Sequence, residues 1–221
     1  MIIRLYRCPF THFTEISIND NFSETAKFYM EKLSLCLSLG TPATMLKKSL
    51  FQNINFNDLK NLNFTHTFAN SGRKAIYFGP KSYSYNGIVH EPLDLPTGIL
   101  SDIFYVISSI FKNHFNSMMI HYYENGLSYI PCHSDDESSI EINSVILSLS
   151  IGETRTFNIM SKSDNKTIKS FNLEHGDLLF MSHQSQRNFK HELPQIIGIR
   201  KKTSISAHLQ KNVCRMIINL L

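Results

Sequence analysis

The chain has 221 residues, 42% of them hydrophobic and 18% charged, with a formal net charge of +4. This composition is that of a globular protein with one substantial core, and the mild basicity is compatible with a polyanionic partner without establishing one. The four cysteines form no C-x-x-C pair, which argues against a zinc knuckle or a disulfide framework and favours a reducing compartment. No apolar run approaches the ~18 residues of a membrane span, so we expect a cytoplasmic protein without a membrane segment or signal peptide.

Residues 1–70 are predicted to form an N-terminal extension that contains a helix and has no assignable role. Asn21 and Glu24 form a loose capping box at the start of this helix, apolar residues follow at helical spacing, and Gly40 ends it.

The next segment, residues 72–90, mixes basic and aromatic residues between turn signals. The pattern alone favours a surface hairpin with aromatic rings packed beneath it. The alternative is a nucleic-acid loop, in which Arg73, Lys74 and Lys81 contact phosphate and a tyrosine or phenylalanine stacks on a base.

A second amphipathic helix is expected from Ile99 to about His114, where it would support a sheet. From Met118 onwards the chain consists of short β-type runs separated by turns such as Asn125-Gly126, with no helical period. Such runs predict an α+β, mainly β chain: an antiparallel double-stranded β-helix, or jelly roll, with the N-terminal helices packed outside it.

One segment of this β region suggests a metal site. In the extended stretch His133-Ser134-Asp135, side chains two residues apart point to the same face, so one ion can receive an imidazole nitrogen and a carboxylate oxygen. One further histidine would complete the two-histidine, one-carboxylate set of non-haem Fe(II) oxygenases. His191 is our candidate for this third ligand.

Other histidines compete for these places. His175-Gly176-Asp177 is a second His-x-Asp unit, but it lies at a glycine turn, where the carboxylate is expected to bond local backbone N–H groups. We favour His133 and Asp135, because the strands between them and His191 would return the chain to the site. His183 competes with His191, and the pattern leaves that choice open. The histidines could also be unrelated surface residues.

Read together, the motifs resemble the AlkB family of Fe(II)- and 2-oxoglutarate-dependent dioxygenases, from about Arg73 to Leu209. The resemblance is carried in order by Y-E-N-G and H-S-D-D-E within 123–137, S-L-S-I-G at 148–152, L-E-H-G-D-L-L-F-M at 173–181, F-K-H-E-L-P at 189–194 and K-T-S-I-S-A-H at 202–208. H-S-D-D-E and R-K-A-I-Y-F-G…Y-S-Y-N-G are most similar to AlkB domains in replicase polyproteins of plant RNA viruses.

The resemblance implies the organisation of the chain. It places an AlkB-like domain at 71–212, with a nucleotide lid at about 72–90, a jelly-roll core at about 117–210 and a C-terminal tail at 213–221. It assigns His133, Asp135 and His191 as the iron ligands and makes His175-Gly176-Asp177 a structural turn. The domain is expected to be monomeric, either free or as a segment of a viral replicase in the host cytoplasm.

The resemblance also implies an activity. With Fe(II), 2-oxoglutarate and O2, the protein would demethylate bases of the 1-methyladenine and 3-methylcytosine type in RNA or DNA, releasing succinate, CO2 and formaldehyde. The base would be single-stranded or flipped out of a duplex. Tyr83 and Tyr85 are the leading stacking residues. The full set of candidate substrate contacts is Arg73, Tyr77, Tyr83, Tyr85, Asp136 and Glu137.

The final strand departs from the family pattern. Two arginines usually bind 2-oxoglutarate there, and the matching positions are Lys202 and His208. Lysine cannot form the bidentate fork, although Arg200, on the same face, could substitute if the strand slipped by two residues. In the first strand Tyr123 is retained and His121 replaces an asparagine. The alternatives are therefore a weakened enzyme that acts as an RNA-binding module, or a dioxygenase with another substrate.

Overall fold

The computed structural model describes residues 43–46, 51, 53–85, 87–95, 97–110, 115–140, 145–196 and 213–219. The helix predicted from Asn21 and the cosubstrate candidates Arg200, Lys202 and His208 lie outside these residues. None of the helices in the described ranges has the length and apolar character of a membrane-spanning segment.

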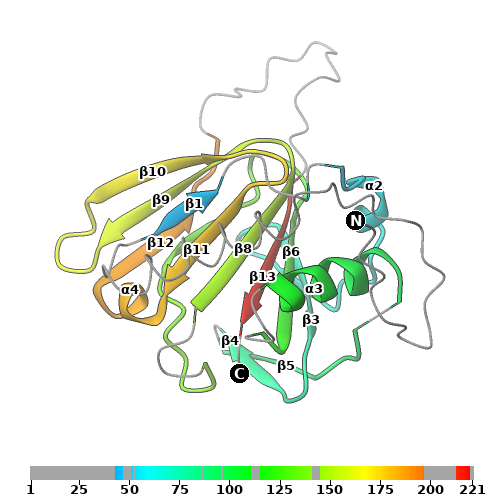
Figure 1. Cartoon of the computed structure of the whole chain (residues 1–221). Coiled ribbons are helices and arrows are strands. Elements are labelled where there is room, and N and C mark those ends of the chain that lie inside the picture. Colours follow the sequence, from blue (N-terminus) through cyan, green and yellow to red (C-terminus); the bar gives the residue numbers. More distant parts are fainter. Residues whose placement is uncertain are drawn as a thin grey trace, which may run out of the picture.

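Two large antiparallel sheets dominate the described structure (Figure 1). The seven-stranded sheet has the order β1-β11-β8-β13-β6-β3-β2. Its strands are β1 (Thr44–Leu46), β2 (His66–Phe68), β3 (Arg73–Phe78), β6 (Ser117–Tyr123), β8 (Val145–Gly152), β11 (Leu178–Ser182) and β13 (Val213–Asn219). The four-stranded sheet has the order β10-β9-β12-β7. Its strands are β7 (Ile130–His133), β9 (Arg155–Ser161), β10 (Thr167–Leu173) and β12 (Phe189–Leu193).

The remaining elements within the described ranges are one small hairpin and three helices. Strands β4 (Tyr83–Tyr85) and β5 (Ile88–His90) pair only with each other. The helices are α2 (Asn57–Lys60), α3 (Ile99–Ile110) and α4 (His183–Asn188). From β6 onwards the chain passes back and forth between the two large sheets, which is consistent with the predicted jelly roll.

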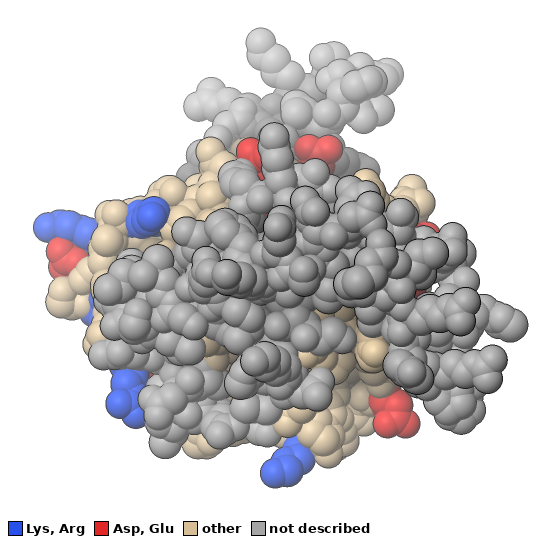
Figure 2. Space-filling view, in the orientation of Figure 1, with Lys and Arg blue, Asp and Glu red and all other residues tan. Residues whose placement is uncertain are grey.

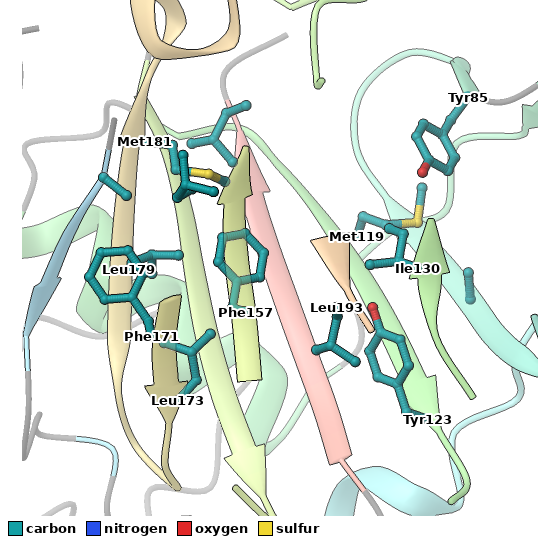
Figure 3. Packing of buried hydrophobic residues seen from close by; sticks show 14 of the residues in the cluster. Tyr85, Met119, Tyr123, Ile130, Phe157, Phe171, Leu173, Leu179, Met181 and Leu193 are labelled. Carbon is teal, nitrogen blue, oxygen red and sulfur yellow. The ribbon is translucent and has the colours of Figure 1, made fainter. Parts of the chain in front are cut away.

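The core has two layers because successive strand side chains point to opposite faces of a sheet. On β8, Leu147 and Leu149 pack in the outer layer with α3, which lies across the large sheet in Figure 1. Ile146 belongs to the inner layer, between the two large sheets. Figure 3 shows this inner layer, in which Phe157 faces residues of the large sheet such as Leu179. The expected support role of α3 therefore agrees with its packing.

Two parts of the predicted organisation differ in the structure. Only β4 and β5 form a separate lid hairpin, whereas Arg73–Phe78 is the sheet strand β3. Residues 213–221 were expected to be a tail, but Val213–Asn219 forms β13 in the interior of the large sheet, between β6 and β8. The expected tail is wrong because the segment V-C-R-M-I-I-N pairs with β6 on one side and with β8 on the other.

Candidate metal centre

Three side chains that were predicted from the sequence meet at one end of the small sheet. His133 ends β7, Asp135 follows it, and His191 lies directly opposite His133 on β12. Each offers one ligand atom, and these atoms lie within 4.8 Å of one another. Asp135 Oδ1 is 3.2 Å from His133 Nε2, and Asp135 Oδ2 is 3.5 Å from His191 Nε2. Strand pairing therefore unites ligands that are far apart in the chain.

Neighbouring groups orient these ligands. The Nδ1–H of His133 donates to the Pro131 carbonyl at 2.8 Å, which leaves Nε2 as the nitrogen that can bind a metal. The backbone N–H of Asp135 donates to Gln186 Oε1 at 3.1 Å. The hydroxyl of Ser134 donates to the Phe189 carbonyl at 2.9 Å, which attaches the ligand loop to the start of β12.

The donor set fits a ferrous ion. His191 and Asp135 are 2% and 4% exposed, so the centre is shielded from water. Two imidazole nitrogens and one carboxylate oxygen on one side of a centre are the set that non-haem Fe(II) oxygenases use, with the other coordination positions left for cosubstrate and O2. The site therefore has the composition and burial that such an ion needs.

The competing His-x-Asp unit makes turn contacts instead. The N–H of Gly152 donates to His175 Nδ1 at 3.1 Å, and the N–H of Glu174 donates to Asp177 Oδ2 at 2.8 Å. Gly176 has φ of 81°, a left-handed conformation that favours glycine. This unit is thus built as a turn before β11. His183 lies at the start of α4.

The β4–β5 hairpin places an aromatic ring beside the centre. The ring of Tyr85 meets that of His133 edge-on, with a centroid separation of 5.7 Å. Tyr83 and Tyr85 lie on the same face of β4, and their rings are nearly parallel, 10° apart in plane and 6.4 Å between centroids. Tyr77 stacks on Tyr83 and donates its hydroxyl to the Lys81 carbonyl at 3.0 Å. Burial raises the pKa of both Tyr83 and Tyr85, which keeps their hydroxyls neutral.

The two acids that follow the ligand loop have different surroundings. Asp136 is exposed and accepts from Lys162 Nζ at 3.0 Å. Glu137 is half-buried beside Tyr83. Burial, and then the charge of Asp135, raise the pKa of Glu137 to about 7. Of the two candidates, only Glu137 is directed towards the lid.

Arg73 also differs from its predicted role. Its side chain is 1% exposed, so it does not form the surface phosphate contact that was expected. Its guanidinium lies 4.0 Å from the centroid of the Phe68 ring and 5.4 Å from that of Tyr85. Arg73 therefore packs behind the stacking tyrosine.

The cosubstrate candidates on β6 face the inner layer. Tyr123 is fully buried, and its hydroxyl has no hydrogen-bond partner within the described part of the chain. His121 is two residues earlier on the same face and 2% exposed. On the adjacent strand β13, Arg215 is in register with His121 and also with Ser150 of β8. This strand had been expected to form a tail.

Arg155 is a buried residue whose structural role no sequence pattern indicated. Its Nη2 donates to the carbonyls of Ser128 and Pro194 at 2.9 and 2.8 Å, and its Nη1 donates to that of Asn125 at 3.3 Å. The guanidinium also lies 5.8 Å from the centroid of the Tyr123 ring. It thereby joins the loop after β6 to the end of β12. No motif marks this role, because its partners are backbone carbonyls.

Comparisons with known proteins agree with this geometry. The family model of the 2OG-Fe(II) oxygenase superfamily matches residues 60–220. The chain is 30% identical over 131 residues to alpha-ketoglutarate-dependent dioxygenase alkB homolog 3 of Mus musculus, a match that covers 56% of this chain and 46% of the relative. It is also 30% identical over 140 residues to the DNA oxidative demethylase ALKBH2 of Bos taurus, covering 59% of this chain and 48% of that relative. The match thus spans about half the length of these curated relatives.

A solved structure supports the fold. The structure of OsALKBH1 aligns with a TM-score of 0.53 and 15% sequence identity, over 81% of this chain and 98% of that one. The family match covers most of the chain, and the His133–Asp135–His191 cluster suits the same chemistry. The chain therefore belongs to the 2OG-Fe(II) oxygenase superfamily, whose members use Fe(II), 2-oxoglutarate and O2.

Proposed function

We propose that this chain oxidatively demethylates N-methylated bases, of the 1-methyladenine and 3-methylcytosine type, in single-stranded RNA and secondarily in DNA. The observation that carries the proposal is the contact of Tyr85 with His133 at 5.7 Å between ring centroids. A base that stacked on Tyr85 would lie beside the metal centre, with its methyl group within reach. The relative ALKBH2 is a DNA oxidative demethylase, which supports a nucleic-acid substrate. The preference for RNA rests on the likeness to viral replicase domains and stays a prediction.

His133, Asp135 and His191 would hold the iron. Bound there, Fe(II) would supply the activation of O2 that couples conversion of 2-oxoglutarate to succinate and CO2 with hydroxylation of the methyl group. The resulting N–CH2OH group then releases formaldehyde, and the unmethylated base remains. The protein's part is to hold the ligands, aim the methyl group and exclude water, for which the buried centre and the lid are suited.

Glu137 is the residue that we assign to the base edge. It lies beside Tyr83, whereas Asp136 turns away to Lys162. A base methylated at a pairing nitrogen is cationic, so a carboxylate in a partly buried setting would favour it over the neutral, unmethylated base. Release of the methyl group removes that positive charge and weakens the attraction, which would assist product release.

For the cosubstrate we assign Tyr123 and Arg215. The buried Tyr123 hydroxyl can donate to a carboxylate of 2-oxoglutarate. Arg215 lies opposite His121 in the backbone register of the β6–β13 ladder. An arginine can bind a carboxylate through two parallel hydrogen bonds. It stands beside Lys202 and His208, which were aligned to the family's arginines and lie outside the described residues.

The test measures succinate and formaldehyde with RNA and DNA oligonucleotides that contain 1-methyladenine or 3-methylcytosine. We expect both products in equal amounts with wild type and neither with Asp135→Ala. If wild type binds iron and 2-oxoglutarate but no methylated oligonucleotide yields formaldehyde, the demethylase assignment is wrong. A protein or small-molecule substrate would then be sought by the same succinate assay.

A further inference from the structure

Five basic residues gather beside the metal centre, at the end of the small sheet. We call this cluster the basic rim: Lys162, Lys166, Lys169, Arg187 and Lys190. The first two lie in the β9–β10 turn, and the others on β10, α4 and β12. Figure 2 shows Lys and Arg atoms along the edge of the molecule where Figure 1 places the β9–β10 hairpin.

The basic rim adjoins the ligand loop through specific contacts. Lys162 Nζ donates to Asp136 Oδ2 at 3.0 Å, next in sequence to the ligand Asp135. Lys190 Nζ donates to Asn165 Oδ1 at 3.2 Å, which joins β12 to the β9–β10 turn. Phe189, beside Lys190, accepts the hydrogen bond from Ser134 in the ligand loop. Lys162 therefore contacts the ligand loop directly, and Lys190 lies next to the residue that anchors this loop.

The charge of the basic rim is only partly balanced. Asp136 pairs with Lys162, and Asp164 pairs with Lys166 at 3.2 Å. No carboxylate within the described ranges forms an ion pair with Lys169, Arg187 or Lys190. Lys169 and Arg187 are exposed, and Lys190 is partly buried. Cations without an ion-pair partner favour binding of a polyanion, because the polyanion releases condensed counterions when it binds them.

The layout of the small sheet suggests which polyanion would bind. The lid and His133 lie at the β7 edge, and the β9–β10 turn lies at the opposite edge, three strand spacings away, or about 14 Å. The end of β7, the start of β12, the end of β9 and the start of β10 all meet at this end of the sheet. A flexible strand that leaves the lid can therefore run across β12 to the basic rim.

We propose that the basic rim binds the phosphate backbone of single-stranded nucleic acid next to the base that occupies the lid. This inference rests on the proposed function for the identity of that base. It assigns two parts to the substrate: the base is held by the lid and the metal centre, and the flanking phosphates are held by lysines of the basic rim. A longer strand should then bind more tightly than a short one that carries the same base.

The first experiment measures binding without turnover. A fluorescent, unmethylated 15-nucleotide RNA, and its DNA counterpart, are titrated by anisotropy with the full chain at several salt concentrations. The rim variant is Lys169→Ala with Lys190→Ala, and Lys162 and Lys166 are kept because they pair with Asp136 and Asp164. The matched control, Lys60→Ala with Lys74→Ala, removes two lysines that lie on α2 and β3.

We expect the rim variant to bind the oligonucleotide about tenfold more weakly than wild type. The magnitude of the slope of log K against log salt should fall by about 1.4, which is ~0.7 for each of the two lost phosphate contacts. The control should bind within about twofold of wild type. If the rim variant keeps wild-type affinity and slope, or if the control loses as much, the inference is wrong. The RNA and DNA arms show whether the backbone sugar matters to this surface.

The second experiment uses the same variants in formaldehyde assays with a methylated trinucleotide and a methylated 15-mer. In the rim variant, KM should rise for the 15-mer and stay unchanged for the trinucleotide. An equal change for both lengths would overturn the inference while leaving the demethylase assignment intact. If wild type releases no formaldehyde from either, the proposed function fails, and the anisotropy result still decides the basic rim.

Discussion

The ring of Tyr85 meets the ring of His133 edge-on, with 5.7 Å between their centroids. One residue belongs to a small hairpin that pairs with neither large sheet, and the other ends a strand of the small sheet. The contact therefore joins the proposed stacking surface to a proposed metal ligand. Arg73 and Phe68 pack behind Tyr85 and hold it in this position.

We expect Tyr85→Ala to raise KM for methylated RNA at least tenfold, because stacking of a base on an aromatic ring contributes about 1–3 kcal/mol. Tyr85→Phe keeps the ring and should stay within about threefold of wild type. Steady-state formaldehyde release measures both. Equal KM values for Tyr85→Ala and wild type would remove Tyr85 from the substrate site.

We expect His191→Ala to abolish tight metal binding, because two ligands remain where three are needed. Anaerobic calorimetry with Fe(II), or with Mn(II) as a stand-in, should show at least a hundredfold loss. The control is His175→Ala, which removes only the acceptor of the Gly152 N–H and should cost about 1 kcal/mol of stability with metal affinity retained. The reverse result would exchange the roles of the two histidines.

Replacing Arg215 should weaken cosubstrate binding, because the backbone register places this position between His121 and Ser150. We expect Arg215→Ala to raise KM for 2-oxoglutarate at least tenfold. It should also reduce the thermal stabilisation that N-oxalylglycine produces with Mn(II) bound. Lys202→Ala serves as the comparison. A larger effect at Lys202 would show that the alignment of K-T-S-I-S-A-H to the family's last strand was correct.

Arg155→Met should destabilise the fold by about 3 kcal/mol, because three backbone carbonyls lose a buried charged donor. Urea denaturation measures the free energy of unfolding. Lys169→Met, at an exposed position, should change it by less than about 0.5 kcal/mol. A loss below about 1 kcal/mol for Arg155→Met would mean that water replaces the guanidinium in these contacts.

The protein should become less stable as the pH is lowered, because of His90. Burial, and then the charges of His66 and Arg73, lower the pKa of His90 from 6.5 to about 4. Between these values the unfolded chain binds a proton that the folded chain does not, so stability is fully present above pH 6.5 and is lost as pH falls towards 4. In His90→Phe, the drop in Tm from pH 7 to pH 5 should be smaller by about 2–4 °C. If Tm falls with decreasing pH by the same amount in wild type and in His90→Phe, His90 is not the cause.

Much of the site was predictable from local pattern. His133-Ser134-Asp135 has the spacing that places two ligands on one face of an extended segment, and the structure brings both to His191. The apolar alternation after Met118 predicted the strands, and the spacing from Ile99 predicted α3. Each of these signals lies within a few residues of chain, where geometry follows from the covalent backbone.

Tertiary structure decided the questions that depend on distant partners. Alternation tells which face of a strand is apolar but not which strand lies beside it, so the insertion of β13 between β6 and β8 could not be deduced. Distant strand partners also determine that Arg73 is buried in a sheet strand, that Asp136 pairs with Lys162 and that Glu137 lies beside Tyr83. The sequence thus determined which chemical groups the site offers. The pairing of segments far apart in the chain determined what surrounds these groups.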